Sequence, residues 1–413
     1  MFIIYDLIFI VYALFALFYY LLKKKLHKEI FFRFYPNVGA DFTGAIWIHA
    51  VSVGEAKAVK NLYGLVKKRF PKEKIIISTI TPAGNNIAKS FVDGKDAVIY
   101  LPLDFSFIVR KFIKKICPKV FVCVETEIWP NLFYRLSKEK VPIIVVNGRV
   151  SLASSKGYRV FNFILKPVLE KINLFCAQTE ADALRIISLG LRRDKVFMTG
   201  NLKFDLELPK KHVYKLDLGL NNEEYLLIAG STHPGEEAII LEVFADLRKD
   251  FHTLKLLLAP RHVNRVKDLE ALCTKFNFTA CRFSLLSEAS RDFQVILLDT
   301  IGDLSSVYSA GDVIFVGGSL VEKGGQNIIE PALFSKPIIF GPNMANFAQI
   351  KDIFLEEKAA LMVKDKLGLE EVLRRLFSDE GERISLGKRA NDIITKNAGA
   401  TSKTLELLSD FIK

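Results

Sequence analysis

Cysteine is scarce in this chain and is never closely paired. The five residues are spread through apolar surroundings without a C-x-x-C motif: Cys117, Cys123, Cys176, Cys273 and Cys281. This spacing excludes the usual zinc and disulfide frameworks and predicts reduced, buried thiols on the cytosolic side of a membrane. An H-E-x-x-H motif and an Asp-x-Asp pair are also absent. We therefore expect neither a protein-held metal nor another bound cofactor.

Signatures of nucleic-acid binding are missing as well. The sequence has no aromatic-interleaved RNA-binding motif and no arginine-rich arm, which argues against a nucleic-acid partner. It does have an excess of positive charge, because 58 Lys and Arg exceed 46 Asp and Glu by 12. Such a surface attracts anions, including nucleotides and acidic lipids. With 413 residues the chain is too long for one ordinary core, so we expect two domains.

Charge is nearly absent from residues 1–22, where Asp6 is the one charged side chain. A helix rises about 1.5 Å per residue, so an apolar run of this length just spans the hydrocarbon core of a bilayer. The basic run KKKLHK follows it, whereas a cleaved signal peptide has its positive charge first and a small-residue cleavage site after. We expect a retained membrane anchor, with the remaining chain on the cytoplasmic face. A helix lying in the membrane interface is the alternative.

From residue 46 onward, short Val- and Ile-rich runs alternate with segments of helical length, such as 56–70 and 130–139. The runs are AIWIHAV, KIIISTI, AVIYL, VFVCVE, PIIVVN, LFCAQ and KVFMTG and, after a break, YLLIAGS, TLKLLLAP, FQVILLD, DVIFVGGS and KPIIFG. This alternation predicts an α/β fold with parallel sheets covered by helices on both faces. The break is charged, contains proline and has no clear period.

These patterns predict five segments. They are an anchor helix at 1–22, an α/β domain at 23–205, a linker at 206–220, a second α/β domain at 221–390, and a C-terminal helix at 391–413 that caps the second domain or crosses back to the first. Two such halves are expected to face a central cleft. Open α/β sheets bind ligands at the carboxyl ends of their strands.

Three carboxylates follow buried strands in the first half. Glu55 begins a helix after IWIHAV, where it either complements the helix dipole, worth about 0.3–1 kcal/mol, or acts as a base. Glu125 and Glu127 follow VFVCV. Strand alternation turns these two to the same face, where each raises the pKa of the other. His49, within its strand, is predicted to be a core residue.

Two loops of the second half follow predicted strands and carry polar or basic residues. AGSTHPGEE supplies Ser231, Thr232 and His233, and LAPRH supplies Arg261 and His262. Helix capping or ion pairing explains each residue taken alone. The convergence of these loops with a third, glycine-rich loop on one sheet edge favours an anionic ligand.

The stretch GGSLVEKGGQNIIEP is the most informative in this half. Gly317 and Gly318 follow the strand VIFV, and Gly324 and Gly325 precede a helix predicted to end near Glu330. Paired glycines let backbone approach a ligand, and N–H groups at a helix start bind phosphate. Glu330, about one turn into that helix, is placed to accept hydrogen bonds from ribose hydroxyls. The pattern indicates a nucleotide site, although glycines also serve ordinary tight turns.

Together these motifs resemble those of one family, the 3-deoxy-D-manno-octulosonic acid (Kdo) transferases of lipopolysaccharide assembly. The resemblance covers nearly the whole chain and rests on the apolar N-terminus followed by HAVSVGE, ETEIWPN, QTEADALR, TGNLKFD, AGSTHPGEE, LAPRH and VGGSLVEKGGQNIIEPA, in order. It implies two Rossmann-like domains of the GT-B type, the first binding the acceptor and the second the donor CMP-Kdo. It also implies an inverting, metal-independent transfer of Kdo to a hydroxyl of the lipid A precursor, lipid IVA.

The resemblance implies roles for single residues as well. Glu55 matches the catalytic base, and Glu125 and Lys203 match positions that stabilise the transition state. The donor site expected from the loops and from the family's CMP-binding segments comprises Ser231, Thr232, Pro260, Arg261, Ile301, Gly302, Asp303, Gly317, Gly318, Gly324, Gly325, Gln326, Asn327, Ile328, Ile329 and Glu330. A lipid acceptor would explain the anchor, because tethering raises the effective concentration of enzyme near it.

Three positions depart from the family's pattern. Gln326 stands where His is usual, Asp303 where Glu is usual, and Gly148 where Ala is usual. Glutamine replaces the hydrogen bond of a neutral histidine but cannot titrate, so we predict that no proton transfer depends on position 326. Two other functions stay open: a GT-B glycosyltransferase or epimerase using another nucleotide-sugar, and a membrane-tethered binder without catalysis.

Overall fold

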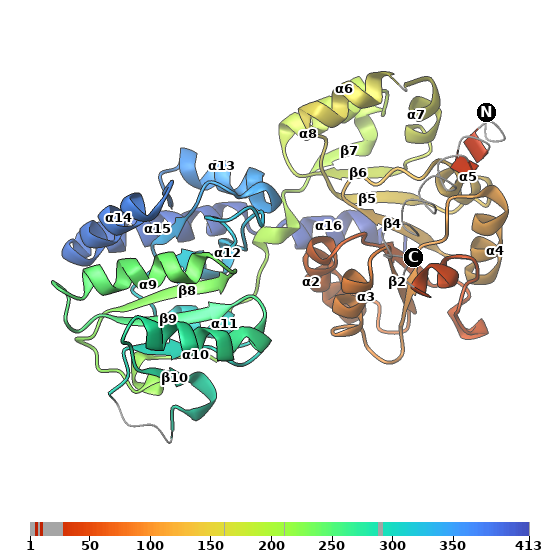
Figure 1. The fold of residues 1–413 in the computed structure, drawn as a ribbon. Coiled ribbons are helices and arrows are strands. Elements are labelled where there is room, and N and C mark those ends of the chain that lie inside the picture. Colours follow the sequence, from red (N-terminus) through yellow and green to blue (C-terminus); the bar gives the residue numbers. More distant parts are fainter. Residues whose placement is uncertain are drawn as a thin grey trace. The chain divides into compact units, whose positions relative to one another are not determined.

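The computed structural model describes residues 5–6, 9–10, 28–160, 162–209, 211–287 and 292–412. The chain forms two compact units, residues 1–205 with 397–413 and residues 206–396, each built around its own sheet (Figure 1). Both sheets are seven-stranded and all their strand pairs are parallel, which confirms the predicted α/β class with two parallel sheets.

The sheet of the first unit has the strand order β3-β2-β1-β4-β5-β6-β7. Its five central strands are fully buried, as is typical of parallel sheets covered by helices, whereas the edge strand at residues 196–198 is largely exposed. The strands are β1 (Ile46–His49), β2 (Ile75–Thr79), β3 (Ala97–Tyr100), β4 (Val120–Val124), β5 (Ile143–Gly148), β6 (Leu174–Ala177) and β7 (Val196–Met198). The helices are α2 (Val53–Arg69), α3 (Pro82–Lys89), α4 (Ser106–Ile116), α5 (Pro130–Lys138), α6 (Leu152–Val160), α7 (Asn162–Leu169), α8 (Glu180–Ser188) and α16 (Ala400–Ser409), with short 3-10 turns η1 (Lys28–Arg33), η2 (Ala40–Phe42), η3 (Arg193–Lys195) and η4 (Leu202–Phe204).

The sheet of the second unit has the order β10-β11-β9-β8-β12-β13-β14. Its strands are β8 (Leu226–Thr232), β9 (Lys255–Pro260), β10 (Ala280–Arg282), β11 (Val295–Leu297), β12 (Val313–Val316), β13 (Ile338–Phe340) and β14 (Leu361–Met362). Its helices are α9 (Glu236–Leu247), α10 (Val266–Lys275), α11 (Leu304–Val307), α12 (Ile329–Ala332), α13 (Ala348–Glu356), α14 (Lys366–Ser378) and α15 (Glu380–Asn397), and its 3-10 turns include η5 (Lys215–Leu218). The sequence pattern missed β10 and β14, because these two edge strands are only partly buried and do not form a continuous apolar run.

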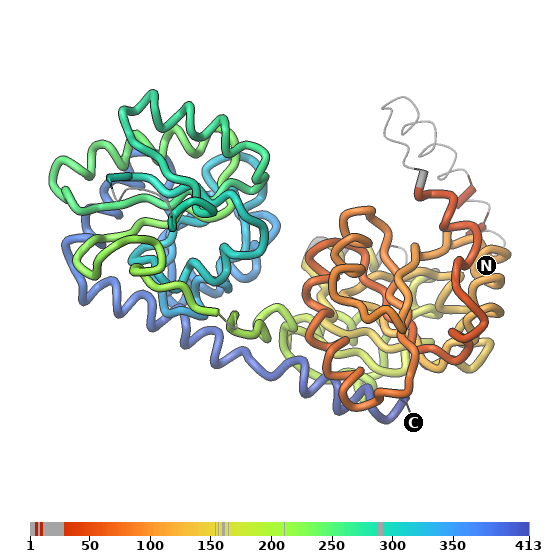
Figure 2. Tube along the Cα trace, turned by 90° about the horizontal axis from the view of Figure 1, so that it is seen from below, coloured from red at the N-terminus to blue at the C-terminus, as the bar shows by residue number. Residues whose placement is uncertain are grey.

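The segments between and after the two sheets differ from the expected boundaries. Residues 206–220 belong to the second unit, where Val213, Leu218 and Leu220 are buried, so they do not act as a free linker. The C-terminal helix does not begin at residue 391, because α15 is continuous to Asn397. The chain then returns to the first unit, where the C-terminus lies (Figure 2), and α16 packs on α2.

Two further expectations concern cysteines and the N-terminus. Cys117 is exposed at the end of α4 and Cys281 is half-buried, so the expectation of burial was wrong for these two; Cys123, Cys176 and Cys273 are buried, and all five are free thiols. The anchor predicted at 1–22 lies almost wholly outside the described residues. Among the helices that are described, none is long and apolar enough to cross a membrane.

Candidate active site

Glu55 is held at the carboxyl end of β1 by the turn that begins α2. Ser52 caps the helix, accepting a hydrogen bond from Glu55 N (3.4 Å) and donating one from Oγ to Glu55 Oε1 (2.9 Å). Val51 N donates to the other carboxylate oxygen, Oε2 (2.7 Å). The small-residue turn therefore fixes both oxygens of a residue that is only 7% exposed.

The surroundings of Glu55 disfavour its charged form. Burial, and after it the negative charge of Glu125, raise the pKa of the Glu55 carboxyl to about 7, against the hydrogen bonds from Val51 and Ser52, which lower it. The two carboxylates are close enough to interact because β1 and β4 are neighbours in the sheet. Glu55 follows β1, and Glu125 follows β4 directly. A carboxyl with a pKa near neutrality is suited to general-base catalysis.

Glu125 and Lys203 form an ion pair at this edge of the sheet. Glu125 has a left-handed backbone, with φ of 59°, which is uncommon for a residue other than glycine and occurs often at functional sites. Its Oε1 lies 3.2 Å from Nζ of Lys203, which the turn η4 presents after β7. Asn201 stabilises that turn by accepting a hydrogen bond from Lys203 N (3.0 Å).

Glu127 and His49 behave largely as expected. Burial and then the charge of Glu125 raise the pKa of Glu127, so the predicted coupling holds for this residue. Strand alternation is not the reason, because Glu125 leaves the strand conformation. His49 is fully buried, its Nδ1 lies 3.1 Å from the carbonyl oxygen of Ser78, and burial lowers its pKa to about 3.

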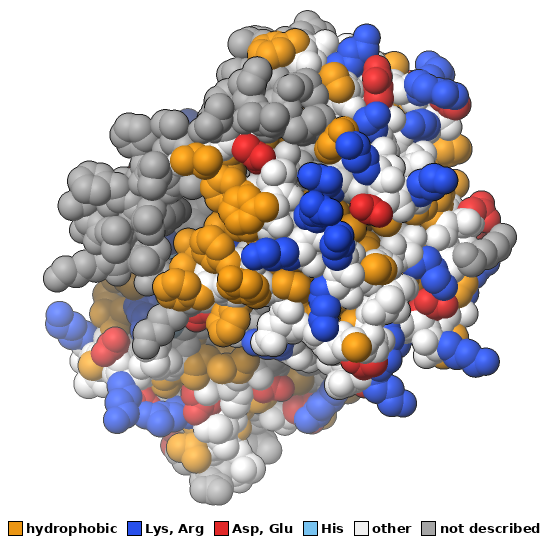
Figure 3. Space-filling model, turned by 90° about the vertical axis from the view of Figure 1, so that its right-hand side faces the viewer, with side chains coloured by type: hydrophobic (Ala, Val, Ile, Leu, Met, Phe, Trp, Pro, Cys, Tyr) orange, Lys and Arg blue, Asp and Glu red, His pale blue; other side chains and the backbone are white. Residues whose placement is uncertain are grey.

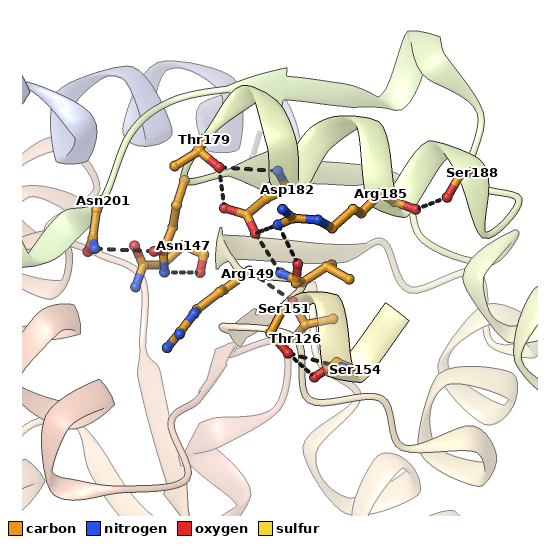
Figure 4. Close-up of polar contacts among 12 residues, drawn as sticks. Thr126, Asn147, Arg149, Ser151, Ser154, Thr179, Asp182, Arg185, Ser188 and Asn201 are labelled. Carbon is orange, nitrogen blue, oxygen red and sulfur yellow. Dashed lines mark hydrogen bonds and ion pairs between the residues drawn. The ribbon is translucent and has the colours of Figure 1, made fainter. Parts of the chain in front are cut away.

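A polar network behind the turn at residues 147–151 was missed by the sequence analysis (Figure 4). Asp182 accepts hydrogen bonds from Val150 N (2.8 Å) and Thr179 Oγ1 (2.6 Å), and Thr126 Oγ1 accepts one from Arg149 N (3.0 Å). The exposed Arg149 side chain points away from the network (Figure 4). The motif QTEADALR, which contains Thr179 and Asp182, was the feature of the sequence from which this network could have been predicted.

The glycine at position 148, one of the departures from the family's pattern, has a steric explanation. A Cβ at this position would lie 2.4 Å from the ring atoms Cε1 and Cζ of Phe175 on β6. Such a contact is far shorter than any real one, so the large ring on the neighbouring strand requires glycine here.

The predicted donor residues of the second unit follow four adjacent strands, β11, β9, β8 and β12. Thr232 pairs with Pro260 in the sheet, and Arg261 N donates to Thr232 O (2.9 Å). A Cβ at Gly317 would lie 2.6 Å from Ser231 O, so the end of β12 needs glycine to pass the end of β8. The loop 301–303 follows β11, and its first residue is 90% exposed.

Glu236 organises this edge and was not singled out from the sequence. It is fully buried and its carboxylate accepts four backbone hydrogen bonds: His233 N (2.9 Å), Gly318 N (2.7 Å), Ser319 N (2.9 Å) and Leu320 N (2.9 Å). These four N–H donors satisfy the hydrogen-bonding capacity of a carboxylate that is shielded from water. Glu236 therefore joins the start of α9 to the turn after β12.

Three of the four glycine N–H groups donate hydrogen bonds within the protein. Gly317 N donates to Gly230 O (2.8 Å), Gly318 N to Glu236, and Gly325 N to Gly318 O (2.8 Å). Gly318, Gly324 and Gly325 have φ of 69°, 81° and 71°, so their role is to form the turn. The N–H groups of Gly317, Gly318 and Gly325 therefore bind the protein's own acceptors, while phosphate binding at the start of the following helix stays a prediction.

The helix expected to end near Glu330 instead begins at Ile329 and has four residues. Glu330 is its second residue, not one turn in. Asn327 orders this start, since its Oδ1 accepts from Ile329 N (3.0 Å) and its Nδ2 donates to Glu330 Oε1 (3.1 Å). A run rich in glycine has no period from which a helix start could be placed.

Gln326 lies against His233, with 3.4 Å between its Nε2 and Nε2 of the imidazole. Burial lowers the pKa of His233, which favours a neutral ring that accepts the amide hydrogen. The rings of His233 and His262 pack edge to face, with 6.2 Å between their centroids. Within the described part of the chain, no group of three or more His, Cys, Asp or Glu is arranged to hold a metal ion.

Comparison with known proteins agrees with this architecture. Residues 25–206 match the family described as 3-deoxy-D-manno-octulosonic-acid transferase (kdotransferase). The chain is 33% identical to the 3-deoxy-D-manno-octulosonic acid transferase of Haemophilus influenzae over 92% of its length and 90% of the relative's. It is 31% identical to the enzyme of that name from Aquifex aeolicus, over 88% and 95%. The crystal structure of UDP-GlcNAc 2-epimerase from Neisseria meningitidis is 13% identical, with a TM-score of 0.58, over 89% of this chain and 100% of that one.

The two parallel sheets and the likeness to the epimerase structure show a GT-B-like fold, and the similarity to named transferases shows that the chain is a glycosyltransferase. The chain belongs to the 3-deoxy-D-manno-octulosonic acid transferase family.

Proposed function

We propose that this enzyme transfers Kdo from CMP-Kdo to a hydroxyl of the lipid A precursor lipid IVA, with inversion at the anomeric carbon. The observation that carries the proposal is the buried Glu55 carboxyl, whose two oxygens are fixed and whose pKa is about 7. Glu55 takes the proton from the acceptor hydroxyl as its oxygen attacks the anomeric carbon. One base suffices for a direct displacement, in contrast to the paired carboxylates of glycosidases.

Charge stabilisation is assigned to the cations of the two sheet edges. Lys203, held 3.2 Å from Glu125, stabilises charge that develops in the transition state. Arg261, whose exposed side chain follows β9, binds the phosphate of the departing CMP. In this proposal these side chains do the work that a metal ion does in other transferases.

The nucleotide and ribose of CMP-Kdo are assigned to the loops around these cations. Arg261 follows β9, whose neighbours in the sheet are β8, which carries Ser231, and β11, which precedes the loop 301–303. The segment 326–330 follows β12, the next strand after β8. Glu330, ordered by Asn327, accepts hydrogen bonds from ribose hydroxyls.

The acceptor is a lipid, so we assign the enzyme to the cytoplasmic face of the inner membrane. The support is the sequence, in which apolar residues 1–22 precede a basic run. A retained anchor holds the enzyme beside its acceptor.

Mass spectrometry of tetra-acylated lipid A precursor, incubated with the enzyme and freshly generated CMP-Kdo, tests the proposal. Wild-type protein should add the mass of one or more Kdo units, and folded Glu55→Ala protein should add none. Glu139→Gln, at an exposed position, is the matched control and should remain active. Transfer from a UDP-sugar but not from CMP-Kdo would favour the other nucleotide-sugar function.

A further inference from the structure

Three buried amide side chains lie at or just beyond the carboxyl ends of β5, β6 and β7: Asn147, Gln178 and Asn201. We call them the amide chain, because Gln178 Nε2 donates to Asn147 O (2.9 Å) and Asn201 Nδ2 donates to Gln178 Oε1 (3.2 Å). Figure 4 shows Asn147 and Asn201 close together at these strand ends. None of the three belongs to the residues assigned to sugar transfer. Burying amides is unfavourable unless they are hydrogen-bonded, so their presence at this edge needs an explanation.

The hydrogen bonds at the two ends of the amide chain fix the orientation of its amide groups. Asn201 Oδ1 accepts from Lys203 N (3.0 Å), so the amide nitrogen of Asn201 must face Gln178. The amide oxygen of Gln178 therefore faces Asn201, and its nitrogen faces the backbone carbonyl of Asn147, which can only accept. A flipped amide would leave buried polar groups unpaired, so one arrangement is strongly favoured.

Asn147 anchors the amide chain in an irregular part of the sheet. The register of β5 against β6 shifts between Val145 and Gly148, and Asn147 has a left-handed backbone with φ of 54°. Bulges of this kind redirect side chains and are frequent beside active sites. Oδ1 of Asn147 accepts from Leu202 N (3.0 Å). The amide chain thus holds two successive N–H groups of the turn η4, those of residues 202 and 203.

The side chain of Lys203 depends on this turn for its position. Its Nζ lies 3.2 Å from Glu125 Oε1, and the two side chains are only 26% and 25% exposed. Lysine has a long, flexible stem, so keeping its ammonium group in one geometry has an entropic cost. A backbone fixed at residues 202 and 203 reduces the freedom that the side chain would otherwise have.

We infer that Asn147, Gln178 and Asn201 are positioning residues for sugar transfer, which hold η4 so that Lys203 stays in its ion pair with Glu125. This role rests on the proposed function, in which Lys203 stabilises charge that develops in the transition state. A misplacement of about 1 Å in such a group costs about a hundredfold in rate.

Chemical labelling of the full-length protein measures the position of Lys203 independently of activity. Trace acetylation by acetic anhydride, quantified for single lysines by mass spectrometry, reports how freely each side chain reaches the reagent. Lys and Arg side chains are abundant on the face shown in Figure 3, and exposed lysines such as Lys115 supply the reference rate. Gln178→Met keeps the approximate size of the side chain but removes both hydrogen bonds. It should raise the labelling of Lys203 about fivefold over this reference, the equilibrium effect of one lost hydrogen bond.

Kinetics then show whether the position of Lys203 matters to the reaction. Gln178→Met should lower kcat for Kdo transfer about a hundredfold and change KM for CMP-Kdo little, because the lost interaction acts in the transition state. In a Lys203→Met background the same substitution should have no further effect, since both changes remove one interaction.

The matched control is Gln294→Met in the second unit. Gln294 is half-buried just before β11, accepts from Thr279 N (2.9 Å) and donates to Asp292 O (3.1 Å). Its substitution therefore also removes two side-chain hydrogen bonds of a glutamine. Labelling of Lys203 and Kdo transfer should both remain as in the wild type.

Two results would overturn the inference. Unchanged labelling of Lys203 in folded Gln178→Met protein, checked by circular dichroism, would mean that the amide chain does not hold this lysine. Additive losses of kcat in Gln178→Met/Lys203→Met would mean that Gln178 acts on another group. If labelling rises but Lys203→Met is as active as wild type, the amide chain does hold Lys203, and the proposed role of Lys203 in transfer is wrong.

A second variant covers the case in which Gln178→Met does not fold. In Asn201→Ser the hydroxyl group still caps the turn but is too short to reach Gln178. Labelling of Lys203 should again rise relative to Lys115, and unchanged labelling would overturn the inference in the same way.

Discussion

Glu55 occupies a helix position where an acid usually makes only a small electrostatic contribution, but burial changes its chemistry. Because its pKa is raised to about 7, we expect kcat/KM to rise about tenfold per pH unit below neutrality and to level off above it. Glu55→Gln should have very low turnover at every pH. A wild-type profile that is flat from pH 5 to 8 would contradict Glu55 as the base.

The same shift has a consequence for folding. The folded-state pKa of Glu55 lies above its ordinary value, so the wild type loses stability as pH rises through the interval between the two. Glu55→Gln lacks this loss, and its stability relative to wild type should increase from pH 5 to pH 8. Urea unfolding at both pH values measures the difference. If the difference in unfolding free energy between the two proteins is unchanged or reversed between these pH values, burial does not raise the pKa of Glu55.

Gly148 gives a steric prediction. Gly148→Ala should destabilise the first unit by about 1–3 kcal/mol, because the methyl group would overlap the ring of Phe175. Gly148→Ala/Phe175→Leu should recover part of this loss. The control is Gly64→Ala, which adds a methyl group in open space on α2 and should be neutral or stabilising. Thermal unfolding compares the three proteins.

At the scale of elements, α16 shows how distant sequence supports the site. Leu408 is fully buried in the core cluster that contains Val59 and Leu62 of α2, the helix whose first turn carries Glu55. Leu408→Ala should cost about 2–5 kcal/mol in the unfolding free energy. Glu406→Ala, at an exposed position of the same helix, should cost little. Similar losses in both variants would indicate weakened helix formation instead of lost packing.

The elements also show what the sequence could predict. Twelve predicted runs correspond to twelve of the fourteen strands, because buried parallel strands are continuous apolar runs that stand out from amphipathic helices. The site residues were placed at strand ends for the same reason. The roles of Gly317 and Glu236 could not be predicted, since they depend on which strand ends become neighbours in the folded sheet, and a single sequence does not specify that order.

At the scale of the whole molecule, the two units have separate hydrophobic cores. CMP should therefore protect the second unit, and calorimetry should show its transition moving to higher temperature by mass action while the other transition changes less. UDP and GDP at equal concentration are the controls and should shift neither transition. Equal protection by UDP would indicate a different donor nucleotide.

The return of the chain to the first unit also bears on its synthesis. Residues up to 205 leave the ribosome long before residues 397–413, yet Leu405, Leu408 and Ile412 belong to the same core as β1 and α2. During translation, the nascent first unit must wait with an uncovered apolar face while the second unit is made. The helix that carries Glu55 becomes fully supported only when Leu405, Leu408 and Ile412 have emerged.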